Sequence, residues 1–423
     1  MEEQRKSENA LVPALRFEGF SDPWEQRKAG DRLVVLRGGS PRPIESYITS
    51  DPSGVNWIKI GDVEPGSMYI TRTSERIRRE GVSKSREVFA GDLLLSNSMS
   101  FGRPYILQVN GCIHDGWLLI RDAEGRFDTI FLQQMLSTPS MARQYKALAA
   151  GGVVNNLNSE LVQSATIAFP GKAEQIKIGA LFQKLDSLIA LHQRKHEKLK
   201  TVKQSLLEKM FPKEGEDVPE IRFEGFTDPW EQRKLSDVAT MHARIGWQNL
   251  RTSEFLDSGD YMLITGTDFN DGAVNYSTCH FVEKERYEQD KHIQIKNGSI
   301  LITKDGTLGK VAYVQGLSMP ATLNAGVFNV EIKDETKVDN KYLFQYLKAP
   351  FLMDYVDKKA TGGTIKHLNQ NILVDFPVVM PSKAEQEAIG VYFQQLDNLI
   401  TLHQRELDIL KNLKQALLEK MFV

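Results

Sequence analysis

The chain has 423 residues, of which 41% are hydrophobic and 26% are charged. At about 150 residues per domain this length favours two or three domains, and the composition excludes wholesale disorder and collagen-like repeats. Lys and Arg number 53 against 55 Asp and Glu, so the net charge of −2 argues against a non-specific polyanion binder, which needs clustered basic charge.

Apolar runs and cysteines limit the class of protein further. No run reaches roughly 18 uninterrupted apolar residues, so no membrane span is expected. Residues 1–6 precede no apolar segment, which argues against a secretory signal. Cys112 and Cys279 could form at most one bridge and cannot build a four-thiolate zinc site, so we expect a reducing cytoplasm.

The first informative element in chain order is a segment that occurs twice. Residues 16–28 read RFEGFSDPWEQRK and residues 222–234 read RFEGFTDPWEQRK, so that only Ser21 and Thr227 differ. A repeat of about 206 residues is too long for a solenoid and indicates a duplicated domain. We call these two segments the leads.

Each lead contains Asp-Pro-Trp, at residues 22–24 and 228–230. The tripeptide invites comparison with the Asp-Pro-Pro-Tyr loop of amino-group methyltransferases. It lacks one residue of that loop, and no glycine-rich cofactor loop accompanies it. We therefore predict a rigid turn whose Trp packs on the helices described below.

The segments that follow the leads, 29–170 and 235–383, differ strongly from each other. Short β-branched and aromatic runs bounded by Gly, Asp or Asn predict strands, and they fall at residues 57–60, 93–95, 261–264 and 327–330. Helical spacing at 131–136 and 342–347 predicts helices that stop at Pro139 and Pro350. Each segment therefore reads as an α+β domain with a twisted sheet.

Polar loops flanked by glycine occupy matching places in both segments. Residues 96–103 correspond to 303–310, and the loops around 155–158 and 364–369 form a second pair. Their side chains are of the types that bind base edges and phosphates, and Gly102 and Gly309 would let the backbone approach a ligand closely. The candidate DNA-binding residues are Asn97, Ser98, Ser100, Arg103, Asn155, Asn156, Asn158, Lys304, Asp305, Thr307, Lys310, Thr364, Lys366, His367 and Asn369. Solvated hairpin loops are the alternative interpretation.

Residues 173–211 and 384–422 form the second repeat and predict two long helices. Both begin with Ala-Glu-Gln and end with Leu-Leu-Glu-Lys-Met-Phe. Apolar residues recur at alternating spacings of four and three, as in a coiled coil, with polar positions near the middle. The predicted seam is Leu181, Leu185, Leu188, His192, Leu199, Val202 and Leu206, with Leu396, Leu399, His403, Leu410, Leu413 and Leu417. The first helix is basic and the second acidic, which favours pairing with each other over two separate surface helices.

Metal and catalytic motifs are weak in this sequence. His192 and His196 lie four residues apart on a helix, but no third ligand is evident, and the second copy has Leu407 in place of the second histidine. Nucleophile elbows, phosphate-binding loops and helicase cores are not recognisable. We therefore predict no metal site and no catalysis by this chain alone.

The expected organisation is α+β, with two pseudo-symmetric α/β domains separated by two long antiparallel coiled-coil helices; the resemblance given next implies that they are target-recognition domains. The segments are an N-terminal lead at 1–28, a first domain at 29–170, a central spacer helix at 171–211, a repeated lead and linker at 212–234, a second domain at 235–383, and a C-terminal spacer helix at 384–423.

This doubled arrangement of leads, variable segments and helices resembles the specificity subunit of type I restriction-modification systems over nearly the whole chain. The resemblance implies that each recognition domain reads one half of a split sequence in double-stranded DNA, and that the helix pair sets the unread spacer. It also implies docking of two modification subunits, which carry S-adenosylmethionine and methylate adenine. Restriction subunits, which use ATP and Mg²⁺, would join that core in a bacterial or archaeal cytoplasm.

Two other classes of protein stay open at this point. A duplicated scaffold could bind proteins through its helices without contacting DNA. A self-sufficient methyltransferase or nuclease is disfavoured, because the cofactor and metal motifs are missing.

Overall fold

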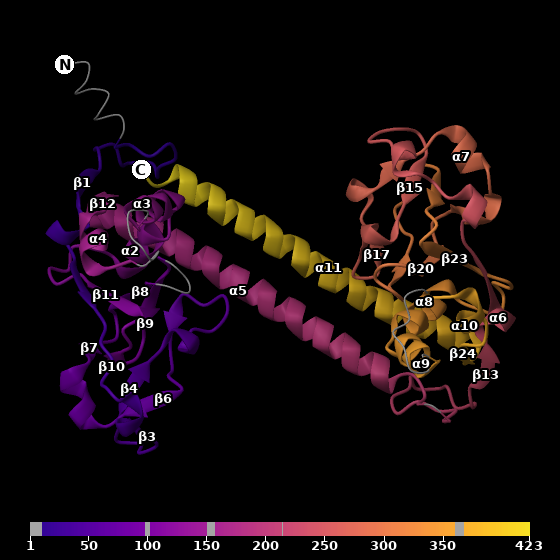
Figure 1. The fold of residues 1–423 in the computed structure, drawn as a ribbon, viewed down its shortest axis with the longest axis horizontal. Coiled ribbons are helices and arrows are strands. Elements are labelled where there is room, and N and C mark those ends of the chain that lie inside the picture. Colours follow the sequence, from indigo (N-terminus) through magenta and orange to yellow (C-terminus); the bar gives the residue numbers. More distant parts are fainter. Residues whose placement is uncertain (1–10, 98–101, 150–156, 214, 360–367) are drawn as a thin grey trace. The chain divides into compact units, whose positions relative to one another are not determined.

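A computed structural model describes residues 11–97, 102–149, 157–213, 215–359 and 368–423, and the chain divides into two compact units. The first unit contains Met1–Lys195 with His403–Val423, and the second contains His196–Leu402. Each unit therefore consists of one globular lobe, part of the central helix and part of the C-terminal helix (Figure 1).

The lobe of the first unit contains two five-stranded sheets. One has the order β2-β11-β8-β9-β5, with β2 Val34–Arg37, β11 Trp117–Arg121, β8 Leu93–Ser96, β9 Pro104–Leu107 and β5 Tyr69–Ile70. The other has the order β3-β6-β4-β10-β7, with β3 Ile48–Thr49, β6 Glu75–Ile77, β4 Val55–Ile58, β10 Gly111–Ile113 and β7 Arg86–Val88. Since side chains alternate along a strand, β8 directs Leu93 and Leu95 into one apolar core and Leu94 into another.

The lobe of the second unit also consists of two sheets, but the strands are divided between them differently. A six-stranded sheet runs β14-β23-β20-β21-β17-β16, with β14 Ala239–His242, β23 Val327–Ile332, β20 Ile300–Thr303, β21 Val311–Tyr313, β17 Ala273–Val274 and β16 Phe269–Asn270. A four-stranded sheet runs β18-β15-β22-β19, with β18 His280–Phe281, β15 Met262–Ile264, β22 Ala321–Leu323 and β19 Gln294–Ile295. Strand β20 again divides its side chains between two cores, with Ile300 and Ile302 on one side and Leu301 on the other.

Each lobe also contains short helices (Figure 1). They are α2 Thr129–Leu136, α3 Pro139–Ala149 and α4 Ser159–Ser164 in the first lobe, and α6 Leu235–Val238, α7 Lys284–Glu288, α8 Asn340–Lys348, α9 Phe351–Lys359 and α10 Gln370–Val374 in the second. The predicted helices and the strands at 93–95, 261–264 and 327–330 are confirmed. The strand predicted at 57–60 is partly correct, because β4 ends at Ile58 and residues 60–62 form a 3-10 turn. Pro139 and Pro350 end one helix as expected, but each also stands at the start of a further helix, α3 or α9, that the pattern did not predict.

The end of each lead forms a strand that pairs with the strand just before a long helix. Strand β1, Glu25–Lys28, is antiparallel to β12, Thr166–Phe169. In the second unit β13, Glu231–Lys234, is antiparallel to β24, Pro377–Met380. The registers match, because Glu25 lies opposite Phe169 and Glu231 lies opposite Met380. The lead is therefore built into the base of each lobe.

The long helices are α5, Lys172–Lys209, and α11, Lys383–Lys420. Their bounds lie within three residues of the predicted 171–211 and 384–423. In the first unit Asp186 of α5 pairs with Lys414 of α11, and His192, further along α5, contacts His403, which comes earlier in α11. The two helices are therefore antiparallel, as predicted.

The predicted seam is correct at some positions and one residue off at others. Leu185 and Leu396 are buried, but Val202, Leu399 and Leu413 are 37%, 44% and 44% exposed and contribute little to it. Buried positions instead include Ile178, Phe182, Leu207, Ile389, Phe393, Ile400, Leu407 and Leu418. The alternating spacing of four and three is retained, with Leu181, Leu206 and Leu417 partly buried beside it. Within the described residues, no helix is both long and apolar enough to cross a membrane.

Candidate nucleic-acid interface

The first turn of each long helix is fixed to its lobe by buried polar side chains. The guanidinium of Arg16 donates to both carboxylate oxygens of Glu174 at 2.7 and 2.8 Å, and Arg222 does the same to Glu385. Both glutamates are at most 2% exposed, and these hydrogen bonds raise the pKa of both arginines. The repeated Arg of the lead and the repeated Glu of Ala-Glu-Gln therefore form one bidentate ion pair in each unit.

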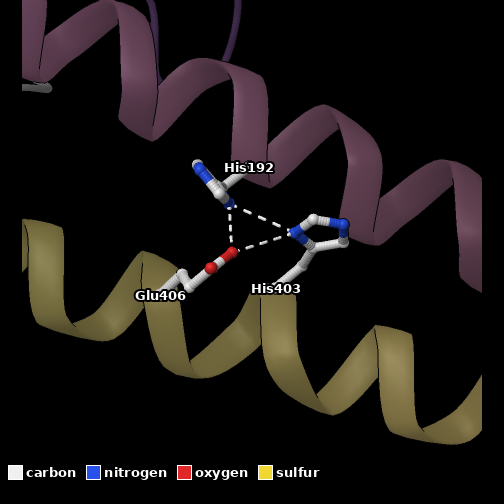
Figure 2. A group of neighbouring side chains, drawn as sticks. All are labelled: His192, His403 and Glu406. Carbon is white, nitrogen blue, oxygen red and sulfur yellow. Dashed lines mark hydrogen bonds and ion pairs between the residues drawn. The ribbon is translucent and has the colours of Figure 1, made fainter.

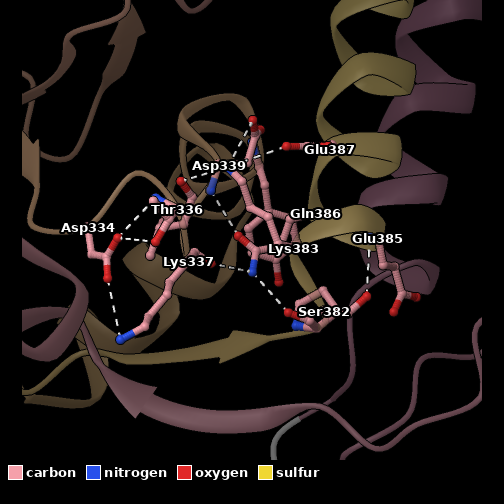
Figure 3. A network of polar contacts seen from close by, with 12 residues as sticks. Asp334, Thr336, Lys337, Asp339, Ser382, Lys383, Glu385, Gln386 and Glu387 are labelled. Carbon is pink, nitrogen blue, oxygen red and sulfur yellow. Dashed lines mark hydrogen bonds and ion pairs between the residues drawn. The ribbon is translucent and has the colours of Figure 1, made fainter.

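The glutamine of Ala-Glu-Gln connects the long helix to the short helix of the lobe. In the first unit the side-chain oxygen of Gln175 accepts a hydrogen bond from the backbone N–H of Asp128 at 2.9 Å. In the second unit Gln386 accepts from the backbone N–H of Asp339, also at 2.9 Å. Figure 3 shows that Gln386 and Lys383 reach the loop before α8, where Lys383 donates to the carbonyl of Val338 at 3.0 Å. Because Asp128 and Asp339 are the N-caps of α2 and α8, the orientation of those helices depends on the long helices.

The tryptophan of each lead packs on the phenylalanine that follows the far end of a long helix. Trp24 lies 6.0 Å from Phe422, and Trp230 lies 6.2 Å from Phe211, each in an edge-to-face arrangement. Both tryptophans are at most 4% exposed. The predicted rigid turn with a packed Trp is thus confirmed in both units, and the Asp-Pro-Trp tripeptide has a structural explanation.

The ends of the first candidate loop are joined by matching backbone hydrogen bonds in both lobes. In the first lobe the N–H groups of Ser96 and Gly102 donate to the carbonyls of Arg103 and Ser96 at 3.1 and 2.9 Å. In the second lobe Thr303 and Gly309 make the corresponding bonds, both at 2.9 Å. The two loops therefore differ in amino-acid sequence but are closed by the same backbone hydrogen bonds.

The glycines in these loops are needed for a reason other than the predicted one. Gly102 and Gly309 have φ values of +72° and +69°, and a Cβ there would lie 2.9 Å from Tyr145 or 2.1 Å from Met353. They allow close packing on helices α3 and α9 of the chain's own lobe. Close approach to a ligand stays a prediction.

The structure brings the two candidate loops of each lobe together. The N–H of Leu157 donates to the carbonyl of Asn97 at 3.2 Å, and the N–H of Leu368 donates to that of Lys304 at 2.8 Å. The first loop and the end of the second loop are therefore adjacent in both copies. Together we call them the loop pair, residues 96–103 with 155–158 and residues 303–310 with 364–369.

The individual candidates occupy different environments. Arg103 and Lys310 are exposed, and the cationic groups of Arg103 and Lys304 lie 5.5 and 5.4 Å from the rings of Tyr105 and Phe328. Asp305 is partly buried, and Thr307, Asn158 and Asn369 are exposed. Ser98, Ser100, Asn155, Asn156, Thr364, Lys366 and His367 lie outside the described residues.

Two asparagines among the candidates support backbone. Asn97 is only 3% exposed, and its amide donates to the carbonyl of Asp115 at 2.9 Å. The side chain of Asn158 accepts the N–H of Leu161 at 2.8 Å and caps α4. In this conformation Asn97 holds the loop in place, and the exposed Arg103 is better placed to contact a ligand.

An open groove of about 610 Å³ lies next to the first loop and contains residues that the sequence did not single out. Its lining includes Ser40, Arg42, His114 and Asp115. Asp115 is central, since it accepts from Ser40 at 3.0 Å and lies 3.8 Å from Arg42. Arg42 keeps 85% of its side chain exposed, which leaves the guanidinium accessible to phosphate.

The two cysteines are buried, free thiols. Burial raises the pKa of Cys112 to about 11 and that of Cys279 to about 12. Both groups therefore stay protonated near neutral pH and are poor nucleophiles.

Two lobes on one repeated framework, each with a polar loop pair, define a duplicated recognition protein. The family model for the type I restriction modification DNA specificity domain matches residues 21–201 and 227–412. The chain therefore belongs to the type I restriction-modification specificity family and contains two copies of its domain.

Relatives and solved structures agree with this assignment. The chain is 22% identical to the MjaVIII specificity subunit of Methanocaldococcus jannaschii, over 94% of this chain and 91% of that one. It is also 22% identical to the EcoBI specificity subunit of Escherichia coli, over 89% and 81%. The S subunit from M. genitalium has the same fold, with a TM-score of 0.61, 17% identity, and coverage of 98% and 99%.

Proposed function

We propose that this chain is the DNA sequence-specificity subunit of a type I restriction-modification complex, and that each lobe reads one half of a bipartite target. The observation that supports the proposal is the loop pair, because matching backbone hydrogen bonds hold its described residues in both lobes while the amino-acid sequences of the loops differ. The helix pair then sets the unread spacer between the half-sites.

The physical argument for two readers is one of specificity. A good base contact discriminates by about 1–3 kcal/mol, so one lobe that reads a few base pairs gains limited selectivity. When a second lobe is tethered to the first, its binding becomes intramolecular and the specificities multiply. Exposed arginine and lysine at the loops supply the phosphate contacts that every such complex requires.

Membership in this family also suggests the partners. We propose two modification subunits, one for each copy of the framework, which would carry S-adenosylmethionine and methylate adenine. Restriction subunits that use ATP and Mg²⁺ would join through them, in the cytoplasm where the genome lies. This chain would itself be non-catalytic.

The test compares one exposed cation from each lobe. Arg103→Ala should weaken binding through the first half-site and Lys310→Ala through the second, each by roughly 5- to 150-fold. Half-sites are defined by mapping modified adenines in cells with and without the gene, and affinities are measured by mobility shift with the co-purified modification subunit. Lys411→Ala, an exposed lysine on α11, is the control and should leave both half-sites unchanged.

Two results would contradict the proposal. The absence of any shift would favour a duplicated scaffold that binds proteins only, and a shift that does not depend on sequence would show that the chain is not a specificity subunit. An equal loss through both half-sites in each variant would show that the lobes do not read independently.

A further inference from the structure

Near the middle of the helix pair, three polar side chains converge where the apolar seam is interrupted. His192 extends from α5, and His403 and Glu406 extend from successive turns of α11 (Figure 2). The Nδ1 atoms of the two histidines are 3.2 Å apart, and Oε2 of Glu406 lies 2.8 Å from His192 and 3.2 Å from His403. We call these residues the central triad.

The triad is shielded from solvent more than its position on two long helices suggests. The side chains of His192 and His403 are 17% and 15% exposed, and that of Glu406 is 40% exposed. Toward the first lobe the seam continues with apolar residues from both helices, since Leu185 of α5 and Leu407 of α11 are buried. Leucine at the triad positions would bury more apolar surface, so the polar groups need a separate explanation.

Protons alone satisfy these three atoms poorly. If both Nδ1 atoms carry a proton, both donate to the same carboxylate oxygen from directions only about 60° apart, about half the separation of its lone pairs. If only Nδ1 of His192 carries a proton, the lone pair on Nδ1 of His403 faces Oε2 of Glu406 at 3.2 Å. Both of these atoms are hydrogen-bond acceptors, so they repel each other. A cation between the three atoms would satisfy all of their lone pairs at once.

We propose that His192, His403 and Glu406 form a binding site for one divalent transition-metal ion, with zinc as the favoured occupant. Two imidazole nitrogens and one carboxylate oxygen are a donor set that zinc accepts, with a water molecule in the fourth position. The three atoms lie on a circle of radius about 1.8 Å, so an ion displaced slightly from their plane reaches bond lengths of about 2.0–2.1 Å without movement of the helices.

A different group in the second unit provides a contrast. His242, His292 and Glu331 also bring three ligand atoms near one another, but the two imidazoles stack with ring centres 4.5 Å apart and planes at 20°. His242 Nε2 lies 3.0 Å from the hydroxyl of Thr240 and 3.7 Å from Glu331. The nitrogen of His242 already has a partner, and its distance to the carboxylate is longer. This second group therefore serves as an internal control.

The proposed ion would connect the two helices of the coiled coil at one fixed register. His192 and His403 are equivalent positions of the repeat, and they meet because the helices are antiparallel. The third ligand breaks this equivalence, since the repeat places Lys195 where the second copy has Glu406. Because the ligands come together only in the folded chain, metal binding would stabilise the first unit.

The experiment uses the full chain without a polyhistidine tag, stripped of metal with a chelator and then titrated with zinc chloride against a chromophoric competitor. We expect one tight ion per chain. His403→Leu, which extends the apolar seam, and Glu406→Gln, which keeps the side-chain shape, should weaken this binding at least 10-fold. His242→Ala should not change it. Circular dichroism confirms that each variant is folded.

Two further measurements make the outcome decisive. Cobalt added to the wild-type chain should give the visible absorption of a low-symmetry four-coordinate ion, and this signal should disappear in His403→Leu. Zinc should raise the melting temperature of wild type and of His242→Ala, but not that of His403→Leu. Loss of the site in His242→Ala with retention in His403→Leu, or no tight ion in wild type, would overturn the proposal. DNA binding is not measured in any of these assays, so their result is independent of the proposed function.

Discussion

In the first unit Arg16 binds Glu174 through hydrogen bonds of 2.7 and 2.8 Å, and in the second unit Arg222 binds Glu385 at the same distances. The arginines at the ends of the strands that follow the two leads have different environments. Arg37 ends β2 and is exposed, whereas Arg244, just after β14, is 2% exposed and donates to the carbonyl of Leu323 at 3.0 Å. Contacts that fix the helices are thus duplicated, and the surface around the loops is not.

The difference has a physical explanation. A buried ion pair or ring contact tolerates little change, because removal of one partner leaves an unsatisfied group or a cavity. An exposed loop residue costs little to replace, so recognition residues can differ without loss of the fold. The comparison can be tested by parallel substitutions in the two units.

The largest effect is expected at the aromatic contacts. Phe211→Ala and Phe422→Ala each remove a ring that packs on the Trp of a lead, and each should lower the free energy of unfolding by about 3–5 kcal/mol. Urea unfolding followed by tryptophan fluorescence measures both. Ile409→Ala, at a 65% exposed position on α11, should change it by less than about 0.5 kcal/mol. A large loss in one phenylalanine variant only would break the equivalence of the two frameworks.

An intermediate effect that differs between the units is expected at the aspartates of the helix pair. Asp186 accepts from Lys414, and Asp397 accepts from Lys203, both at 2.6 Å. In the second unit Lys348 also lies 3.7 Å from the carboxylate of Asp397. Asp397→Ala would leave two lysines facing each other and should cost about 3 kcal/mol, whereas Asp186→Ala should cost about 1–2 kcal/mol.

The measurement for this pair is again urea unfolding, with Asp→Asn variants at both positions as isosteric controls. If Asp186→Ala were as costly as Asp397→Ala, the additional lysine would not matter. The two helix ends would then be energetically equal as well as alike in geometry.

Sequence reasoning located the fold well because its signals are local. Pro170 and Pro212 bracket the first long helix, and β-branched runs such as 327–330 become buried strands. The seam was one residue off at Val202 and Leu399, because several apolar residues fit a heptad and tertiary packing decides between them. That packing comes from residues distant in sequence.

The candidate site was predictable only in part, for the same reason. The loops were found by composition, but the hydrogen bond between Leu157 and Asn97 joins residues 60 positions apart and leaves no local pattern. Arg42 and His114 line one groove although they are also far apart in the sequence. The central triad did have a signal, since antiparallel helices with equivalent polar positions near their middle bring His192 and His403 together.

The smallest effect distinguishes the helix ends by pH. Burial, with a further contribution from the nearby Lys348, lowers the pKa of Lys203 to about 8, although Asp397 opposes this shift. Between about pH 8 and the pKa of a free lysine, the unfolded chain binds more protons than the folded chain, so stability rises with pH. Between pH 8 and pH 9 this single group should add about 1 kcal/mol. Urea unfolding should show that the free energy of unfolding increases by this additional amount between pH 8 and pH 9 in wild type and in Lys414→Met. The additional increase should be absent in Lys203→Met. If the difference between wild type and Lys203→Met stayed constant from pH 8 to pH 9, the two lysines would be equivalent, and burial at the second unit's helix end would have no electrostatic cost.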